Sequence, residues 1–98
     1  MKPRVLVIDD EPGIRGAVRQ VLEYEGMQVE VAGSGQEGLK AFSEFAPYVV
    51  LLDVKMAGMD GLEVLAKLKE RDPGAIVVMI SGHGTIATAV QATQRGAF

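Results

Sequence analysis

The sequence predicts an α/β fold, a doubly wound parallel sheet made of four βα units, and three features of its 98 residues support this. Short aliphatic runs alternate four times with longer segments that have helical apolar spacing. Three of the runs are continuously apolar, which is typical of parallel strands covered on both faces. Three of them end directly before an aspartate or a serine. We therefore treat residues 1–98 as one small domain.

The first two units occupy residues 5–46. Residues 5–8 form a buried strand, and a helix follows with Pro12 in its first turn. Its apolar face has helical spacing: Ile14, Ala17, Val18, Val21 and Leu22. Gly26 is expected to end this helix. Residues 28–31 alternate polar and apolar, which predicts an edge strand, and Ser34 is expected to cap a second helix. The apolar face of that helix is Leu39, Phe42 and Ala46.

The other two units follow Pro47, which is expected to end the second helix. Residues 48–52 form a buried strand that ends before Asp53. After a loop, residues 62, 65 and 68 give a third helix its leucine face. A turn at residues 72–74 leads to a fourth strand, which starts at Ala75 and ends at Ile80, before Ser81. A last helix is expected over residues 85–94.

Composition narrows the possible functions. Ten Lys and Arg against 13 Asp and Glu give a net charge of −3, without the basic excess that direct nucleic-acid binding requires. There is no cysteine, so disulfides and thiolate metal sites are excluded. The sequence has no signal peptide and no apolar stretch near the roughly 18 residues that span a membrane. We expect a cytoplasmic protein without a membrane partner.

Polar side chains gather where the predicted strands end: Asp9, Asp10, Asp53 and Ser81. The carboxyl ends of parallel strands share one edge of the sheet, so these residues are expected to converge. Crowded carboxylates favour a hard divalent cation such as Mg²⁺, which in turn accepts a phosphoryl group. One carboxylate can then form an aspartyl-phosphate. A purely structural alternative is that Asp10 caps the first helix.

Three segments carry a family resemblance: residues 7–12 (VIDDEP), residues 51–61 (LLDVKMAGMDG) and residues 81–84 (SGHG). They resemble the receiver domain of bacterial two-component response regulators, and residues 81–90 are similar to receivers of the nitrogen-regulatory type. The resemblance implies a flavodoxin-like fold and the sheet order 2-1-3-4-5. It implies that Asp53 is the phosphoacceptor and that Ser81 is the hydroxyl that contacts the phosphoryl group. It also implies that Asp9, Asp10, Asp53 and the Lys55 main-chain carbonyl bind Mg²⁺.

By this resemblance the protein is a signalling switch. It takes a phosphoryl group from a sensor histidine kinase and, in an intact protein, regulates transcription. It is not an enzyme with a separate product, and it catalyses only its own phosphorylation and dephosphorylation. Against the family pattern the chain ends at Phe98, before a fifth strand with a lysine and a fifth helix. The strand from Ala75 to Ile80 is then an open edge. This predicts a homo-oligomer and an alternative role as a self-associating fragment with a weak or inert site.

A second alternative is a nucleotide site. The six residues from Gly33 to Gly38 match G-x-G-x-x-G at a helix start, and Asp53 lies twenty positions after Gly33, as in a dinucleotide fingerprint. The preceding strand reads as an edge strand, whereas a nucleotide-binding first strand is central and apolar. Too few residues follow for a complete dinucleotide fold. We therefore rank this alternative below the phosphoacceptor.

Overall fold

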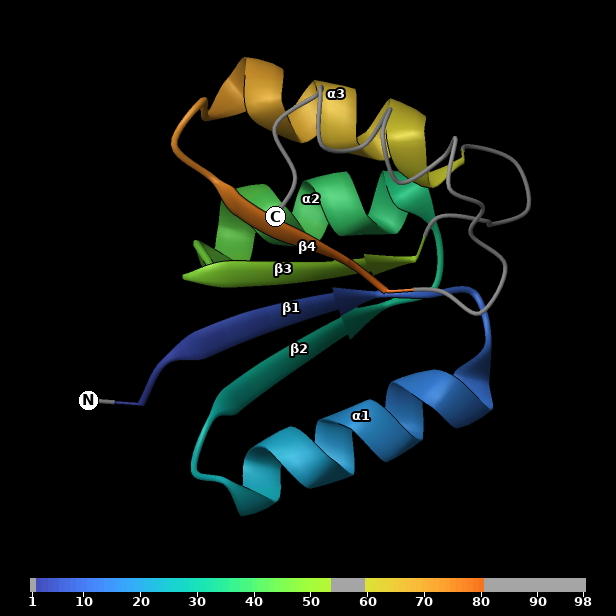
Figure 1. Cartoon of the computed structure of the whole chain (residues 1–98), viewed down its shortest axis with the longest axis vertical. Coiled ribbons are helices and arrows are strands. Elements are labelled where there is room, and N and C mark those ends of the chain that lie inside the picture. Colours follow the sequence, from blue (N-terminus) through green and yellow to red (C-terminus); the bar gives the residue numbers. More distant parts are fainter. Residues whose placement is uncertain (1, 54–59, 81–98) are drawn as a thin grey trace.

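A four-stranded parallel sheet with helices on both faces is seen in the computed structural model, which describes residues 2–53 and 60–80 (Figure 1). The elements are β1 (Arg4–Ile8), α1 (Pro12–Tyr24), β2 (Gln28–Ala32), α2 (Gly35–Phe45), β3 (Val49–Asp53), α3 (Gly61–Arg71) and β4 (Ile76–Ile80). The predicted α/β class and parallel sheet are confirmed. The helix expected at residues 85–94 lies outside the described residues.

The strands lie in the order β2-β1-β3-β4. β2 is therefore an edge strand, as its alternating pattern predicted. β1 and β3 are central neighbours, and Ile8 of β1 pairs in register with Leu52 of β3. An aspartate follows each of these two residues in the chain: Asp9 follows Ile8, and Asp53 follows Leu52. Sheet order and register thus bring the two acids to the same end of adjacent strands.

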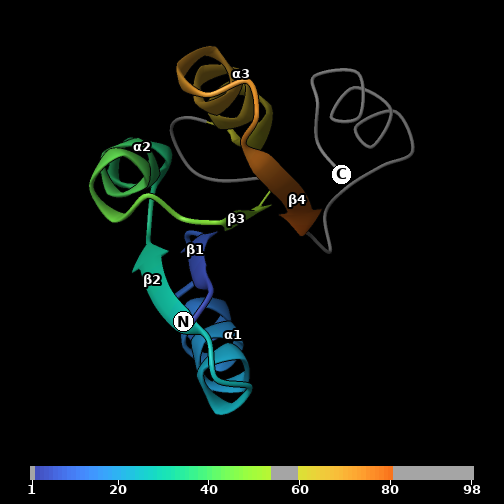
Figure 2. The same cartoon turned by 90° about the vertical axis from the view of Figure 1, so that its left-hand side faces the viewer.

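Alternate residues of β1 face two separate apolar cores. Leu6 and Ile8 are fully buried beneath α2 and α3, whereas Val5 and Val7 belong to the core beneath α1. Figures 1 and 2 show α1 on one face of the sheet and α2 and α3 on the other. A strand that is buried on both faces must be apolar at every position, which explains the uninterrupted run of β1.

Most of the predicted helix ends are confirmed. α1 begins at Pro12, and Gly26 follows its C-terminus with a φ of +87°, a left-handed conformation that glycine adopts without a steric penalty. The Ser34 hydroxyl caps α2 by accepting a hydrogen bond from the Glu37 N–H. Ala46 was wrongly assigned to the apolar face of α2. It is an exposed left-handed cap residue after the helix, with a φ of 49°.

The glycine motif that resembles a nucleotide fingerprint has packing roles here. A Cβ on Gly38 would lie only 2.5 Å from Ile8 Cδ1, so glycine lets α2 approach β1 closely. The Gly33 N–H donates to Glu37 Oε2 at 2.9 Å, which closes the turn before the helix. The motif also follows an edge strand. These observations favour a structural explanation of the motif over a dinucleotide site.

On the face of the sheet that packs against α1, the described elements cover β3 and β4 less completely than they cover β1. Side chains of β3 and β4 on the α1 side are only partly buried: Val49, Leu51, Ile76 and Val78. On α1 itself, Val21 is 62% exposed. Within residues 2–53 and 60–80, β4 pairs only with β3. Among the described helices, none has the length and apolarity needed to cross a membrane.

Candidate functional site

Three carboxylates form a cluster at the carboxyl ends of the two central strands. Asp9 and Asp10 directly follow β1, and Asp53 is the last residue of β3. Within residues 2–53 and 60–80, each offers one carboxylate oxygen such that all three atoms lie within 4.8 Å of one another. The convergence predicted for these three acids is therefore observed. Residues 44 positions apart in the chain meet because β1 and β3 are adjacent.

Burial makes this cluster unusual. Asp9 is 4% exposed and Asp53 is 5% exposed, while Asp10 is half-buried. Aspartate is rarely buried unless it is paired or binds a metal, because desolvation penalises its charged form. The cluster is therefore costly to the fold and is the candidate functional site of the described chain.

Asp9 is held through both its side chain and its main chain. The Asp9 Oδ1 accepts a hydrogen bond from the Glu11 N–H at 2.9 Å, and the Asp9 main-chain N–H donates to the Ala32 carbonyl of β2 at 3.1 Å. Burial raises the pKa of the Asp9 carboxyl, and the nearby charges of Asp53 and Asp10 raise it further. The hydrogen bond from Glu11 acts in the opposite direction. A cation at this point would relieve both the burial penalty and the repulsion.

The alternative that Asp10 caps α1 is wrong. The N-cap position is Glu11, and its side chain makes no capping hydrogen bond. The carboxylate that reaches this helix start belongs to Asp9, through the Glu11 N–H. Asp10 instead belongs to the carboxylate cluster.

Two residues expected at the site, Lys55 and Ser81, lie outside the described residues. Their assignment therefore stays a prediction. Arg15 was missed in the sequence and lies beside the cluster, since its Nη1 donates to the Asp9 main-chain carbonyl at 2.8 Å. Arginines are common on helix surfaces, and a contact with a main-chain carbonyl leaves no signal in the sequence.

The donor set fits Mg²⁺. Mg²⁺ prefers hard oxygen ligands, and proteins usually supply one or two carboxylates while water and phosphate complete the shell. Asp9, Asp10 and Asp53 provide carboxylate oxygens close enough to share one ion. Within residues 2–53 and 60–80, no histidine or cysteine, the ligands that zinc favours, joins this cluster.

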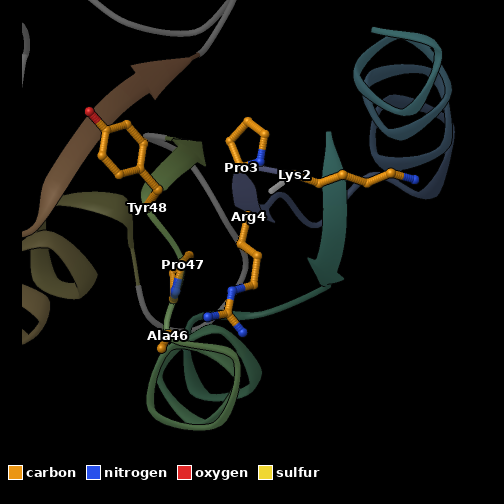
Figure 3. A pocket seen from close by; sticks show the side chains of 6 residues that line it. All are labelled: Lys2, Pro3, Arg4, Ala46, Pro47 and Tyr48. Atoms are coloured by element: carbon orange, nitrogen blue, oxygen red, sulfur yellow. The ribbon is translucent and has the colours of Figure 1, made fainter. Parts of the chain in front are cut away.

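A hollow lies at the opposite end of the sheet, where the strands begin. It measures about 490 Å³ and is lined by Lys2, Pro3, Arg4, Ala46, Pro47 and Tyr48. Figure 3 shows the side chains of Lys2, Arg4 and Tyr48 running in three different directions. The Arg4 guanidinium already lies over the Phe45 ring, 5.8 Å from its centre. Because these groups do not converge, the hollow is not a second candidate site.

Comparisons with known proteins point to one family. Residues 5–98 match the response regulator receiver domain. The chain is 43% identical over 96 residues to the nitrogen assimilation regulatory protein NtrX of Azorhizobium caulinodans, covering 96% of this chain and 21% of that protein. It thus spans about a fifth of the length of this curated relative.

Solved structures give the same answer. The receiver domain of NtrX from Brucella abortus superposes with a TM-score of 0.90 at 44% identity, covering 96% of this chain and 80% of that one. A CheX-CheY-BeF3-Mg²⁺ complex from Borrelia burgdorferi contains a chain that matches with a TM-score of 0.92 at 28% identity, covering 97% of this chain and 73% of that one. By sequence, by fold and by its acidic strand ends, the chain belongs to the response regulator receiver domains, the signalling switches of two-component systems.

Proposed function

We propose that Asp53 is the phosphoacceptor of this receiver domain and that Asp9, Asp10 and Asp53 bind the Mg²⁺ ion it requires. The single observation that carries the proposal is the set of three converging carboxylate oxygens, two of them on buried side chains. A bound cation stabilises such a cluster, because it offsets both the burial and the mutual repulsion of the charges. The related structure from Borrelia burgdorferi is a complex that includes BeF3 and Mg²⁺, which supports the same ion here.

The reaction is a phosphoryl transfer to a carboxylate. A carboxylate oxygen of Asp53 attacks the phosphorus of a phosphohistidine on a sensor kinase, and an O–P bond forms as the N–P bond breaks. The electron pair of the broken bond stays on the imidazole, which then takes up a proton. The bound Mg²⁺ supplies positive charge that offsets the charge on the phosphoryl oxygens. Asp9 and Asp10 hold that charge next to Asp53.

The two remaining assignments complete this proposal. The Lys55 main-chain carbonyl serves as a further Mg²⁺ ligand, and the Ser81 hydroxyl contacts the phosphoryl group. Phosphorylation then shifts the population between two arrangements of the segment that follows β4. The domain acts only on its own Asp53, so it is a switch and not an enzyme with a separate product.

The biological setting is also proposed. The donor is a sensor histidine kinase, and Ile14, which is 42% exposed near the start of α1, offers it an apolar contact. The curated relative named above is a nitrogen assimilation regulatory protein, which supports a regulatory role, and the role proposed for the intact protein is in transcription. Action in the cytoplasm stays a prediction.

Self-association is the second candidate. β4 pairs with β3 on one side only within residues 2–53 and 60–80, and it is rich in β-branched residues. An unpaired strand edge of this kind can bind the same strand of another copy. Light scattering after size-exclusion chromatography tests this. A mass that grows with concentration supports the homo-oligomer, and a monomer throughout the micromolar range contradicts it.

The test of the phosphoacceptor is intact-mass spectrometry after incubation with acetyl phosphate and MgCl₂. The expected result is the gain of one phosphoryl group that requires Mg²⁺ and is absent in Asp53→Asn. The matched control is Glu44→Gln, which removes a carboxylate from the exposed surface of α2. If wild type is not labelled while an intact receiver is, the site is inert and the phosphoacceptor proposal fails.

A further inference from the structure

Arg15 links the acidic cluster to the turn after β2. Its side chain leaves the second turn of α1, and Nη1 donates to the main-chain carbonyl of Asp9 at 2.8 Å. The residue is half-buried and its contact with Asp9 is partly shielded from water. A hydrogen bond from a charged donor in such a setting is stronger than one between neutral groups.

The absence of a side chain at Gly33 also favours this placement of the Arg15 guanidinium. A Cβ on this residue would lie 2.9 Å from Arg15 Nη1 and 3.3 Å from Arg15 Cζ. The three closest atoms it would meet all belong to the Arg15 guanidinium. Gly33 has no positive φ, so its lack of a side chain makes room and does not serve an unusual backbone. The turn after β2 therefore leaves space for this guanidinium.

The remaining contacts of Asp9 explain why its backbone position matters. Its N–H donates to the Ala32 carbonyl, the residue before Gly33, and its carboxylate accepts from the Glu11 N–H. Main-chain and side-chain atoms of Asp9 thus make three contacts: with the end of β2, with the N-cap of α1 and with Arg15. A shift of the Asp9 backbone would change the position of its carboxylate relative to Asp10 and Asp53.

We infer that Arg15 is a positioning residue that fixes Asp9 for cation binding from the main-chain side, an inference that rests on the Mg²⁺ site proposed above. Removing such an outer partner of a metal ligand typically weakens metal affinity by about 10-fold or more. Electrostatics alone predicts the opposite, because loss of a positive charge near a cation site favours the cation. The direction of the change therefore separates positioning from simple charge.

The test is a Mg²⁺ titration followed by amide NMR shifts in wild type, Arg15→Ala and Arg19→Ala. Arg19 lies one turn further along α1, where it pairs with Glu23 at 3.3 Å on the exposed surface. We expect Arg15→Ala to bind Mg²⁺ about 10-fold more weakly and Arg19→Ala to bind it as wild type does. Affinity in Arg15→Ala equal to or tighter than wild type overturns the inference.

Gly33→Ala adds a second arm. Its Cβ should displace the guanidinium and weaken Mg²⁺ binding in the wild-type background, but it should have no further effect in Arg15→Ala. Equal effects in both backgrounds would mean that Gly33 acts without Arg15, against the inference.

A third arm needs no metal. Hydrogen exchange at the Asp9 and Glu11 amides should accelerate in Arg15→Ala but not in Arg19→Ala, while exchange at Val7 in β1 stays unchanged. Unchanged exchange at Asp9 and Glu11 contradicts positioning. If wild type binds no Mg²⁺, the proposed function fails, and this arm still decides whether Arg15 holds the loop.

Discussion

The close contact between Gly38 of α2 and Ile8 of β1 makes Gly38→Ala a sharp test of the packing. The new Cβ would lie 2.5 Å from Ile8 Cδ1, 2.9 Å from Cγ1 and 3.1 Å from Cγ2. Ile8 is fully buried, so it has little room to move. Helix and strand must therefore separate, at the strand that carries Asp9 at its end.

Two opposing effects set the magnitude. Replacing glycine by alanine inside a helix stabilises the helix by about 1 kcal/mol. Overpacking a tight core costs about 1–3 kcal/mol. The expected net result is a loss of about 1 kcal/mol of unfolding free energy. The matched control is Gly16→Ala in α1, where a Cβ would meet nothing within 4 Å. That change should raise the unfolding free energy by about 0.5–1 kcal/mol.

Urea unfolding followed by circular dichroism measures both changes. With an m-value of about 2 kcal/mol/M, Gly38→Ala should lower the unfolding midpoint by about 0.5 M while Gly16→Ala raises it. Ile8→Val removes Cδ1, so it should cost less in the Gly38→Ala background than in wild type. A Gly38→Ala protein as stable as Gly16→Ala would refute the close approach of α2 to β1.

Two further predictions concern Asp9 and Asp60. Because the pKa of Asp9 is raised, the folded state binds more protons than the unfolded state between the unfolded-state pKa of about 3.9 and the higher folded-state pKa, and stability falls as pH rises through that window. Asp9→Asn should therefore raise the unfolding midpoint at pH 7 but not at pH 3; an equal effect at both values contradicts the burial penalty. Asp60 caps α3 by accepting from the Glu63 N–H at 2.9 Å. Asp60→Ala should cost about 1 kcal/mol in urea unfolding, and Asp60→Asn much less; equal losses would rule out the cap.

Local patterns in the sequence were enough for most of the fold. Uninterrupted apolar runs identified β1 and β3 as buried strands, and alternation identified β2 as an edge strand. These predictions were possible because the pattern of apolar residues in a strand depends on whether one or both of its faces are covered. Ala46 was misplaced since its helical spacing continued past the point where the backbone turns left-handed. The turn depends on the chain's approach to β3, which helical periodicity does not report.

The site was predicted in part. Acids at strand ends must share an edge, so Asp9, Asp10 and Asp53 were expected together. Their carboxylate oxygens lie within 4.8 Å of one another because β1 is next to β3, and that strand order came from the family resemblance and not from spacing. The role of Arg15 was not predicted, because a hydrogen bond to a main-chain carbonyl does not depend on the type of the accepting residue and so leaves no pattern in the sequence. Glu11, and not Asp10, occupies the helix cap because α1 starts only at Pro12.

Cation affinity is the direct measure of whether three acids from two strands share one divalent cation. Titration of the protein with MgCl₂, followed through the amide signals of residues 9, 10 and 53, should give saturable binding. Affinity should fall at least tenfold in Asp10→Asn and in Asp53→Asn, and it should not change in Glu44→Gln. Equal affinity in all four proteins, or no saturable binding in wild type, would contradict a cation site shared by Asp9, Asp10 and Asp53.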